Sequence, residues 1–148
     1  MRRFTVFILL TVFLGLSLAS AEQVLAGKVK KIRGTVFVTR GDRTQTLQVG
    51  DPVFQNDLMQ TGATGAVGII FEDNTILSLG PKSRLAIDGY TFAPEQGKLS
   101  LLLRLLRGTA SYLSGIIGKQ APEAVKFQTP DATIGIRGTK FLVKVGSD

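Results

Sequence analysis

The sequence predicts an all-β domain, built as a single solenoid-like or flattened roll, or a sandwich, of short strands. Turn signals made of Gly, Asp, Asn or Pro recur at intervals of ~8–12 residues. The runs between them alternate apolar with polar residues or are rich in β-branched ones. The chain has 148 residues, of which 44% are hydrophobic and 20% are charged. This length and composition fit one globular domain.

The first 21 residues have the pattern of a secretory signal peptide. Two arginines after Met1 precede an uncharged apolar run over 4–18, and a small-x-small triplet follows at 19–21. The run is shorter than the ~20 residues of a bilayer span. We therefore expect cleavage after Ala21 rather than an uncleaved anchor. The mature domain would be residues 22–148, in the periplasm or secreted, with a membrane contact only through the signal peptide.

The first half of the mature chain alternates short strands with turns. Residues 35–39 are β-branched or aromatic and predict a strand. Gly-Asp at 41–42 predicts the turn after it. Residues 44–49 alternate again, which would place Leu47 and Val49 on one face of a strand, and the following Gly-Asp-Pro ends that run.

Two apolar runs, 67–71 and 75–79, flank Glu-Asp-Asn at 72–74. They predict a β-hairpin with a solvated acidic turn. The leucine-rich run 99–107 is compatible with a helix, because Leu and Arg favour helices. It carries no capping pair, however, and Gly follows at once, so a strand with its odd-numbered leucines on one face is favoured. A short helical turn is expected within 114–120.

The tripeptide Arg-Gly-Thr occurs three times, at 33–35, 107–109 and 137–139. Each copy follows Ile or Leu and precedes a strand-like run. We expect a shared corner in which Gly permits a bulge or a positive φ, although coincidence in a basic, Gly-rich chain is the alternative. Valine in place of any of the three glycines should then destabilise the fold.

The run over 129–143 resembles the C-terminal signature of FecR-type periplasmic domains. Its characteristic residues, which we expect to be structural, are Thr129, Pro130, Gly135, Arg137, Gly138 and Thr139. Weaker pieces in the same order extend the resemblance over about 25–145. The resemblance implies an extracytoplasmic all-β module, which in the namesake proteins is the periplasmic part of an iron–siderophore signalling regulator.

The chain departs from that family pattern in two respects. In the namesake regulators a cytoplasmic anti-sigma segment and a transmembrane helix precede the domain, whereas only a signal peptide is expected here. Transmembrane signalling is therefore not implied. Many relatives also continue past the strand 141–145 with a further hairpin. We expect this strand to be either an open edge for a partner or the last strand of a shortened chain.

The residue types present exclude several kinds of chemistry. The chain contains no Cys, His or Trp. This excludes thiol and Ser–His nucleophiles, Cys/His zinc sites, and haem or iron–sulfur ligation. The carboxylates are expected to be solvated or to cap turns, and no calcium-loop motif is present. We therefore expect no enzyme activity, no catalytic residue, no metal and no cofactor, and a glycan-active enzyme is disfavoured.

Eighteen basic residues against 11 acidic ones give a net charge of +7. The basic residues form one cluster, Lys28, Lys30, Lys31 and Arg33, and a possible second, Arg137, Lys140 and Lys144. No nucleic-acid motif or set of stacking aromatics accompanies them, and export would separate the protein from nucleic acid. The expected partner is an envelope protein or an anionic envelope component. A solvated face that maintains solubility explains the charge equally well.

These observations predict an exported, non-enzymatic binding or scaffold module of the cell envelope. It would recognise a partner protein or an envelope ligand through a β surface, for example by strand addition at 141–145. The alternatives are an envelope structural or assembly component without a small ligand, and an accessory to iron-uptake-type surface signalling. The sequence leaves the identity of the ligand and the oligomeric state open.

Overall fold

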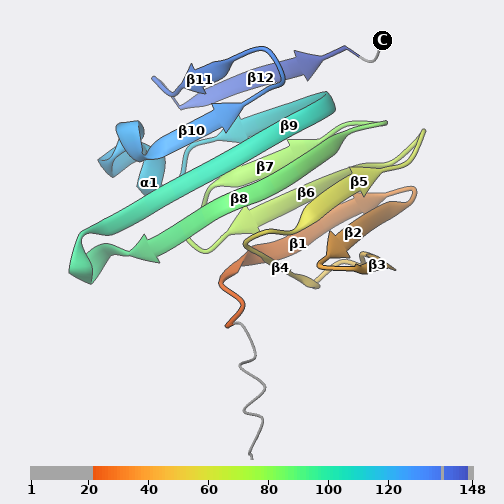
Figure 1. The fold of residues 1–148 in the computed structure, drawn as a ribbon, viewed down its shortest axis with the longest axis horizontal. Coiled ribbons are helices and arrows are strands. Elements are labelled where there is room, and N and C mark those ends of the chain that lie inside the picture. The colour runs from red at the N-terminus through yellow and green to blue at the C-terminus, as the bar shows by residue number, and fades with distance from the viewer. Residues whose placement is uncertain (1–21, 138, 147–148) are drawn as a thin grey trace, which may run out of the picture.

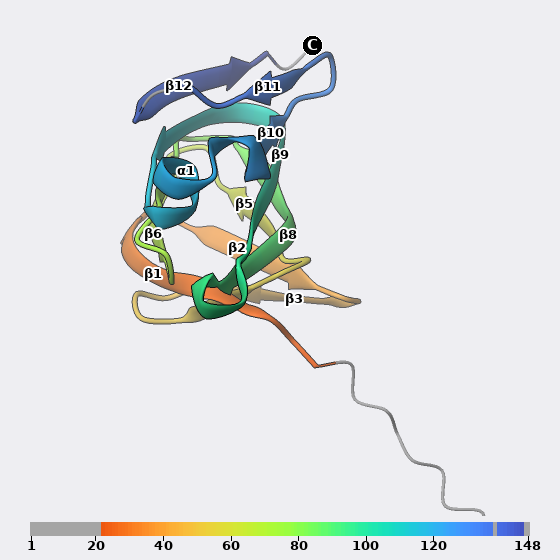
Figure 2. The same cartoon turned by 90° about the vertical axis from the view of Figure 1, so that its left-hand side faces the viewer.

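The computed structural model describes residues 22–137 and 139–146, which form one twelve-stranded sheet that folds over on itself. The predicted signal peptide and its cleavage site lie outside the described residues. The sheet curls into a roll, seen from its end in Figure 2, and its two halves are here called sheet A and sheet B (Figures 1 and 2). The predicted all-β class, a flattened roll of short strands, is confirmed.

Six strands contribute to sheet A, in a fully antiparallel order. They are β4 (Pro52–Phe54), β1 (Leu25–Arg33), β6 (Ala66–Phe71), β7 (Ile76–Leu79), the second half of β9 (Lys98–Leu113) and β12 (Lys140–Val145). β6 and β7 are the predicted hairpin, and Asn74 in its turn has a φ of 67°.

Sheet B contains the remaining strands and the first half of β9. Its order is β3 (Arg43–Thr46), β2 (Val36–Arg40), β5 (Leu58–Thr61), β8 (Arg84–Ala93), β9, β10 (Val125–Gln128) and β11 (Thr133–Gly135). β10 runs parallel to β9, whereas the other pairs are antiparallel.

The long strand β9 belongs to both sheets. Residues 98–107 pair with β8, and residues 108–113 pair with β7 and β12. The odd-numbered leucines of its first half alternate as predicted, with Leu101, Leu103 and Leu105 fully buried. They pack into one core with the inward residues of both sheets.

Two of the three Arg-Gly-Thr copies mark a passage of the chain between the sheets. Gly34, with φ +62°, lies between β1 in sheet A and β2 in sheet B, and Gly108, with φ +89°, lies where β9 passes from sheet B to sheet A. A Cβ atom on Gly108 would lie 2.4 Å from the Cα atom of Ser83. The expected shared corner therefore exists for the two copies described, and Gly138 of the third lies outside the described residues.

A short helix closes one end of the roll. α1 (Ile116–Gln120) follows β9, as expected, and lies at the end of the curled sheet (Figure 2). Its residue Ile117 is fully buried. Two 3-10 turns, η1 (Pro94–Gln96) and η2 (Pro122–Ala124), complete the secondary structure. Among the described residues no helix has the length and hydropathy of a membrane span.

The expected pairing of Leu47 and Val49 on one face is wrong. β3 ends at Thr46, after which Leu47 turns inward, 3% exposed, while Val49 is 63% exposed. The reason is a tight turn, in which the backbone N–H of Gln48 donates to the carboxylate of Asp51 and reverses the chain before β4.

Candidate functional site

The outer face of sheet A carries most of the predicted basic residues. Strand pairing places successive outward residues of five strands in rows that cross the sheet. The row from β1 to β12 nearest the β6–β7 turn is Lys28, Ile70, Ile76, Leu113 and Lys140. The next row is Lys31, Gly68, Ser78, Ser111 and Leu142. A third row has Arg33, paired with Ala66, at its β1 end and Lys144, paired with Thr109, at its β12 end.

We call these three rows the cationic face. Five exposed cations occupy its two sides, namely Lys28, Lys31, Arg33, Lys140 and Lys144. No acidic side chain lies in the three rows, and none of the five cations forms an ion pair with a described residue. The first acid beyond the rows on β6 is Glu72, in the hairpin turn.

The structure joins the two predicted clusters only in part. Lys30 is exposed and lies at a bulge in β1, where the pairing with β6 shifts between Val29 and Lys31. Arg137, assigned to the second cluster, lies apart from it. It lines a separate hollow of about 520 Å³ with Lys126, Glu123 and residues of β11.

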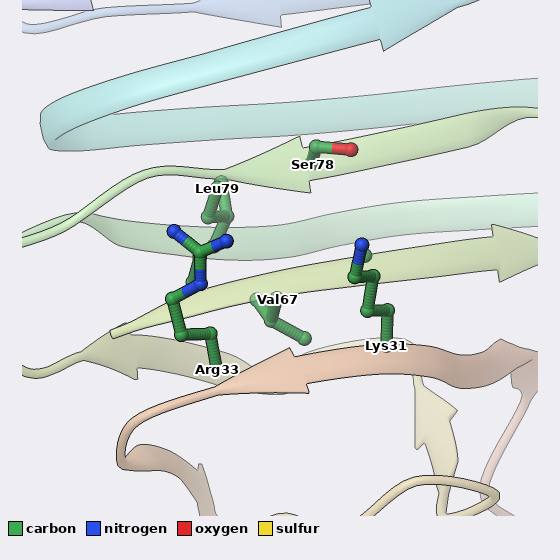
Figure 3. Close-up of a pocket in the computed structure, with 7 residues that line it drawn as sticks. Lys31, Arg33, Val67, Ser78 and Leu79 are labelled. Carbon is green, nitrogen blue, oxygen red and sulfur yellow. The ribbon is translucent and has the colours of Figure 1, made fainter. Parts of the chain in front are cut away.

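A shallow hollow of about 240 Å³ lies beside Lys31 and Arg33 (Figure 3). It forms because Gly68 has no side chain and its neighbour Ser78 has a short one. In Figure 3 both cationic side chains rise from β1 and extend across β6 towards β7. The hollow thus exposes strand backbone and small side chains next to two positive charges.

Aliphatic side chains lie between the two cationic sides. Ile76 is 41% exposed, Leu113 is 38% exposed and Leu142 is 71% exposed. All three point outward from sheet A. The cationic face therefore combines positive charge with uncovered apolar surface, a combination suited to anions that carry apolar groups.

Of the family-like signature, Thr129 and Pro130 lie between β10 and β11, and Gly135 ends β11. Arg137 and Thr139 lie between β11 and β12, and Gly138 lies outside the described residues. Thr129 closes the turn between β10 and β11, since its hydroxyl accepts a hydrogen bond from the Ala132 N–H. The carbonyl oxygen of Thr139 accepts a hydrogen bond from the Ser114 N–H, which ties the start of β12 to the end of β9. Both contacts fit the expected structural role, which stays a prediction.

Sequence reasoning missed a buried carboxylate at Asp73. The hairpin turn was expected to be solvated, yet this side chain is fully buried. Its Oδ2 atom accepts hydrogen bonds from the Thr75 hydroxyl at 2.7 Å and the Ile117 N–H at 3.1 Å. Its Oδ1 atom accepts from the Thr75 N–H and the Tyr90 hydroxyl, both at 3.3 Å. An Asp two residues before a Thr is the local signal that could have indicated a structured turn.

The surroundings of this carboxylate also affect a tyrosine. Burial, followed by the negative charge of Asp73, raises the pKa of Tyr90 far above its ordinary value. The Tyr90 hydroxyl also accepts a hydrogen bond from the Asp73 N–H. The cluster is enclosed by α1 and serves to hold the end of the roll closed.

A second missed interaction is the ion pair between Arg40 and Asp57. Both bonds of the pair measure 2.7 Å, and Asp57 is fully buried. The hydrogen bond that Arg40 donates to the Asp57 carboxylate raises the pKa of Arg40. The guanidinium also lies 4.4 Å from the ring centre of Phe54, so this pair fixes β2 to the β4–β5 turn.

Comparisons with known proteins place the chain in a family. A search of curated proteins finds no match. One solved structure, described as a "Cell surface anchoring domain", is 33% identical over 40% of this chain and 80% of that chain, with a TM-score of 0.39. A family model described as "FecR protein" matches residues 57–148, from the end of the β4–β5 turn onward. The resemblance over 25–56 stays a prediction. Because the match covers more than half of the sequence, the chain belongs to the FecR family, whose domains are associated with the cell envelope.

Proposed function

We propose that the protein is an exported, non-enzymatic module of the cell envelope that binds an anionic envelope component through the cationic face. The observation that supports this most strongly is the meeting of two basic clusters more than 100 residues apart in the sequence. β1 carries Lys28, Lys31 and Arg33, and β12 carries Lys140 and Lys144 on the same side of sheet A.

The spacing of these charges suits a shared electrostatic field. Four steps between neighbouring strands, each ~4.8 Å, separate β1 from β12 by about 19 Å. The screening length at physiological salt is about 8 Å, so the two sides act together on a ligand that is long enough to lie over both. A face of one sign attracts an extended anion better than the same number of scattered charges.

The test is retention on agarose coupled to dextran sulfate, with uncharged dextran agarose as the blank. The variant Lys28→Gln/Lys31→Gln/Arg33→Gln should elute at clearly lower salt than the parent. The matched control removes three exposed cations elsewhere, Arg43→Gln/Lys98→Gln/Lys126→Gln, and should elute later than the face variant. Equal elution of the two variants would show that net charge alone governs binding and would refute the proposal.

Export is a separate part of the proposal and has its own measurement. The tripartite pattern of residues 1–21 and the envelope association of the family support it. Protein recovered from the envelope of expressing cells should have Glu22 as its first residue by mass spectrometry. An intact Met1 on soluble cytosolic protein would contradict export.

Strand addition at β12 is a second candidate, supported by its open edge. Within the described residues β12 pairs only with β9, so the backbone groups of its other edge have no partner strand. Envelope extract should slow hydrogen exchange at the β12 amides if a partner strand binds there. Another edge strand, β3, is the internal control, and unchanged exchange at β12 would exclude this mode.

A further inference from the structure

We propose that the ligand of the cationic face is a phospholipid bilayer with anionic headgroups, and that exposed aliphatic side chains of the face enter the headgroup region. This inference rests on the proposed function, because it names the anionic component that the face binds. It makes the domain a peripheral membrane protein that attaches by a β-sheet face.

The first argument is the order of residues across the sheet. In the row Lys28, Ile70, Ile76, Leu113 and Lys140, two lysines flank three aliphatic side chains. Leu142 in the adjacent row is 71% exposed, the highest exposure of any large hydrophobic residue described. Proteins that lie on a bilayer combine basic and apolar side chains on one surface in this way.

The second argument is the concentration of apolar exposure on this face. Seven large hydrophobic residues are exposed in the described chain, and Ile76, Leu113 and Leu142 are three of them. Water-exposed apolar groups that lie close together mark sites of protein or membrane contact. Here cations lie at both ends of the row, where long lysine side chains reach headgroup phosphates while their stems cover apolar surface.

The third argument is that the face lacks the side chains by which proteins usually recognise other polyanions, such as nucleic acids and acidic glycans. The three rows contain no aromatic side chain on which a base or a sugar ring could stack. Four of the five cations are lysines, which act as point charges without the planar fork of arginine. Such point charges are sufficient to bind a diffuse layer of lipid phosphates. Each Lys or Arg near the membrane surface increases the affinity about fivefold.

The experiment compares vesicles of phosphatidylcholine with vesicles that also contain phosphatidylglycerol, by co-sedimentation with the purified protein. Dextran sulfate affinity is measured in parallel. The parent should bind the anionic vesicles and not the neutral ones. The variant Lys28→Gln/Lys31→Gln/Arg33→Gln should lose about 100-fold in vesicle affinity, from three losses of about fivefold each.

An apolar variant separates the inference from the proposed function. Leu142→Ser/Ile76→Thr should bind anionic vesicles about tenfold more weakly, whereas its dextran sulfate affinity should fall by a much smaller factor, because only the bilayer offers an apolar phase. The control Val49→Ser/Phe37→Thr changes two exposed residues outside this face and should bind both probes as the parent does.

A fluorescence measurement guards against effects on folding. The chain has no Trp, so Leu142→Trp introduces a single reporter at the most exposed position. Its emission should shift to the blue with anionic vesicles, whereas that of Val49→Trp should not.

The outcomes distinguish the two proposals. Unchanged vesicle binding by the apolar variant, together with an unshifted Leu142→Trp emission, would overturn lipid docking. In that case continued dependence of dextran sulfate affinity on the cations would leave a soluble polyanion, such as an acidic glycan, as the ligand. If the cation variant bound both vesicles and dextran sulfate as tightly as the parent does, the proposed function itself would be overturned.

Discussion

Replacing Asp73 by Ala tests the view that a buried carboxylate closes the end of the roll. This side chain joins the β6–β7 hairpin to α1, more than 40 residues later in the sequence, through its bond with the Ile117 N–H. It also accepts the backbone N–H and the hydroxyl of Thr75. The carboxylate is fully buried, so water does not replace these bonds while the fold is intact.

The size of the effect follows from the donors that lose their acceptor. In Asp73→Ala the Thr75 and Tyr90 hydroxyls lose the acceptor of their own protons, but each still accepts an N–H, from Gly115 and from residue 73, and a hydroxyl can rotate to another acceptor, so only the amides are counted. The Ile117 and Thr75 amides keep none. A buried donor without a partner costs ~1–3 kcal/mol, so the free energy of unfolding should fall by about 2–6 kcal/mol.

Urea unfolding followed by circular dichroism measures this loss. Asp73→Asn preserves the shape and one acceptor oxygen and should lose less than Asp73→Ala. The neighbouring exposed Glu72→Ala is the matched control, with an expected change within ~0.5 kcal/mol. A loss below ~1 kcal/mol for Asp73→Ala would refute the role assigned to this carboxylate.

Three further predictions concern other parts of the fold. Gly108→Val should lower the free energy of unfolding by ~3 kcal/mol or more, because it combines a positive φ with a clash against the Ser83 backbone. Arg40→Ala should cost ~3 kcal/mol in the same assay, since it leaves buried Asp57 without its cation. The pKa of Tyr90 is raised in the folded protein, so above pH ~10 this hydroxyl ionises in the unfolded chain before it does in the folded one. The free energy of unfolding should therefore decrease as the pH rises from there, by up to ~1.4 kcal/mol per pH unit. Tyr90→Phe should reduce that slope.

The first two of these predictions have a control in the same chain. Gly41 has a φ of +62° and open space around it, so Gly41→Val should cost only the ~1–2 kcal/mol of backbone strain. Exposed Arg43→Ala should leave stability within ~0.5 kcal/mol. Equal losses in Gly41→Val and Gly108→Val would contradict the close packing at the second glycine. A pH slope unchanged by Tyr90→Phe would contradict the assigned titration.

The strand pattern could be predicted because strand periodicity is local. The alternation of leucines in 99–107 indicated correctly which side of β9 is buried, and the apolar runs around 72–74 indicated the hairpin. The error at Leu47 and Val49 has the same origin. Alternation predicts which residues share a side only while the chain stays extended. Here the chain bends, because the Asp51 carboxylate accepts a hydrogen bond from the Gln48 N–H.

The sequence predicted the two groups of cations in the candidate site, but not that they lie on one surface. The cluster at Lys28 to Arg33 is visible in the sequence, and so are the lysines of β12, but nothing local indicates that they share a surface. They do so because β1 reaches β12 through three intervening strands in one register. Arg137, next to the same lysines in the sequence, lies outside that face because it precedes β12.

The order of residues alone therefore determined the all-β class, the positions of most strands and turns, and the glycine corners. Only the tertiary structure decided that five cations and three exposed aliphatic residues meet on one face, and that Asp73 is buried. The physical reason is that cross-strand register and the covering of a turn by a distant helix depend on contacts between segments far apart in the chain. Periodicity within each segment carries no information about those contacts.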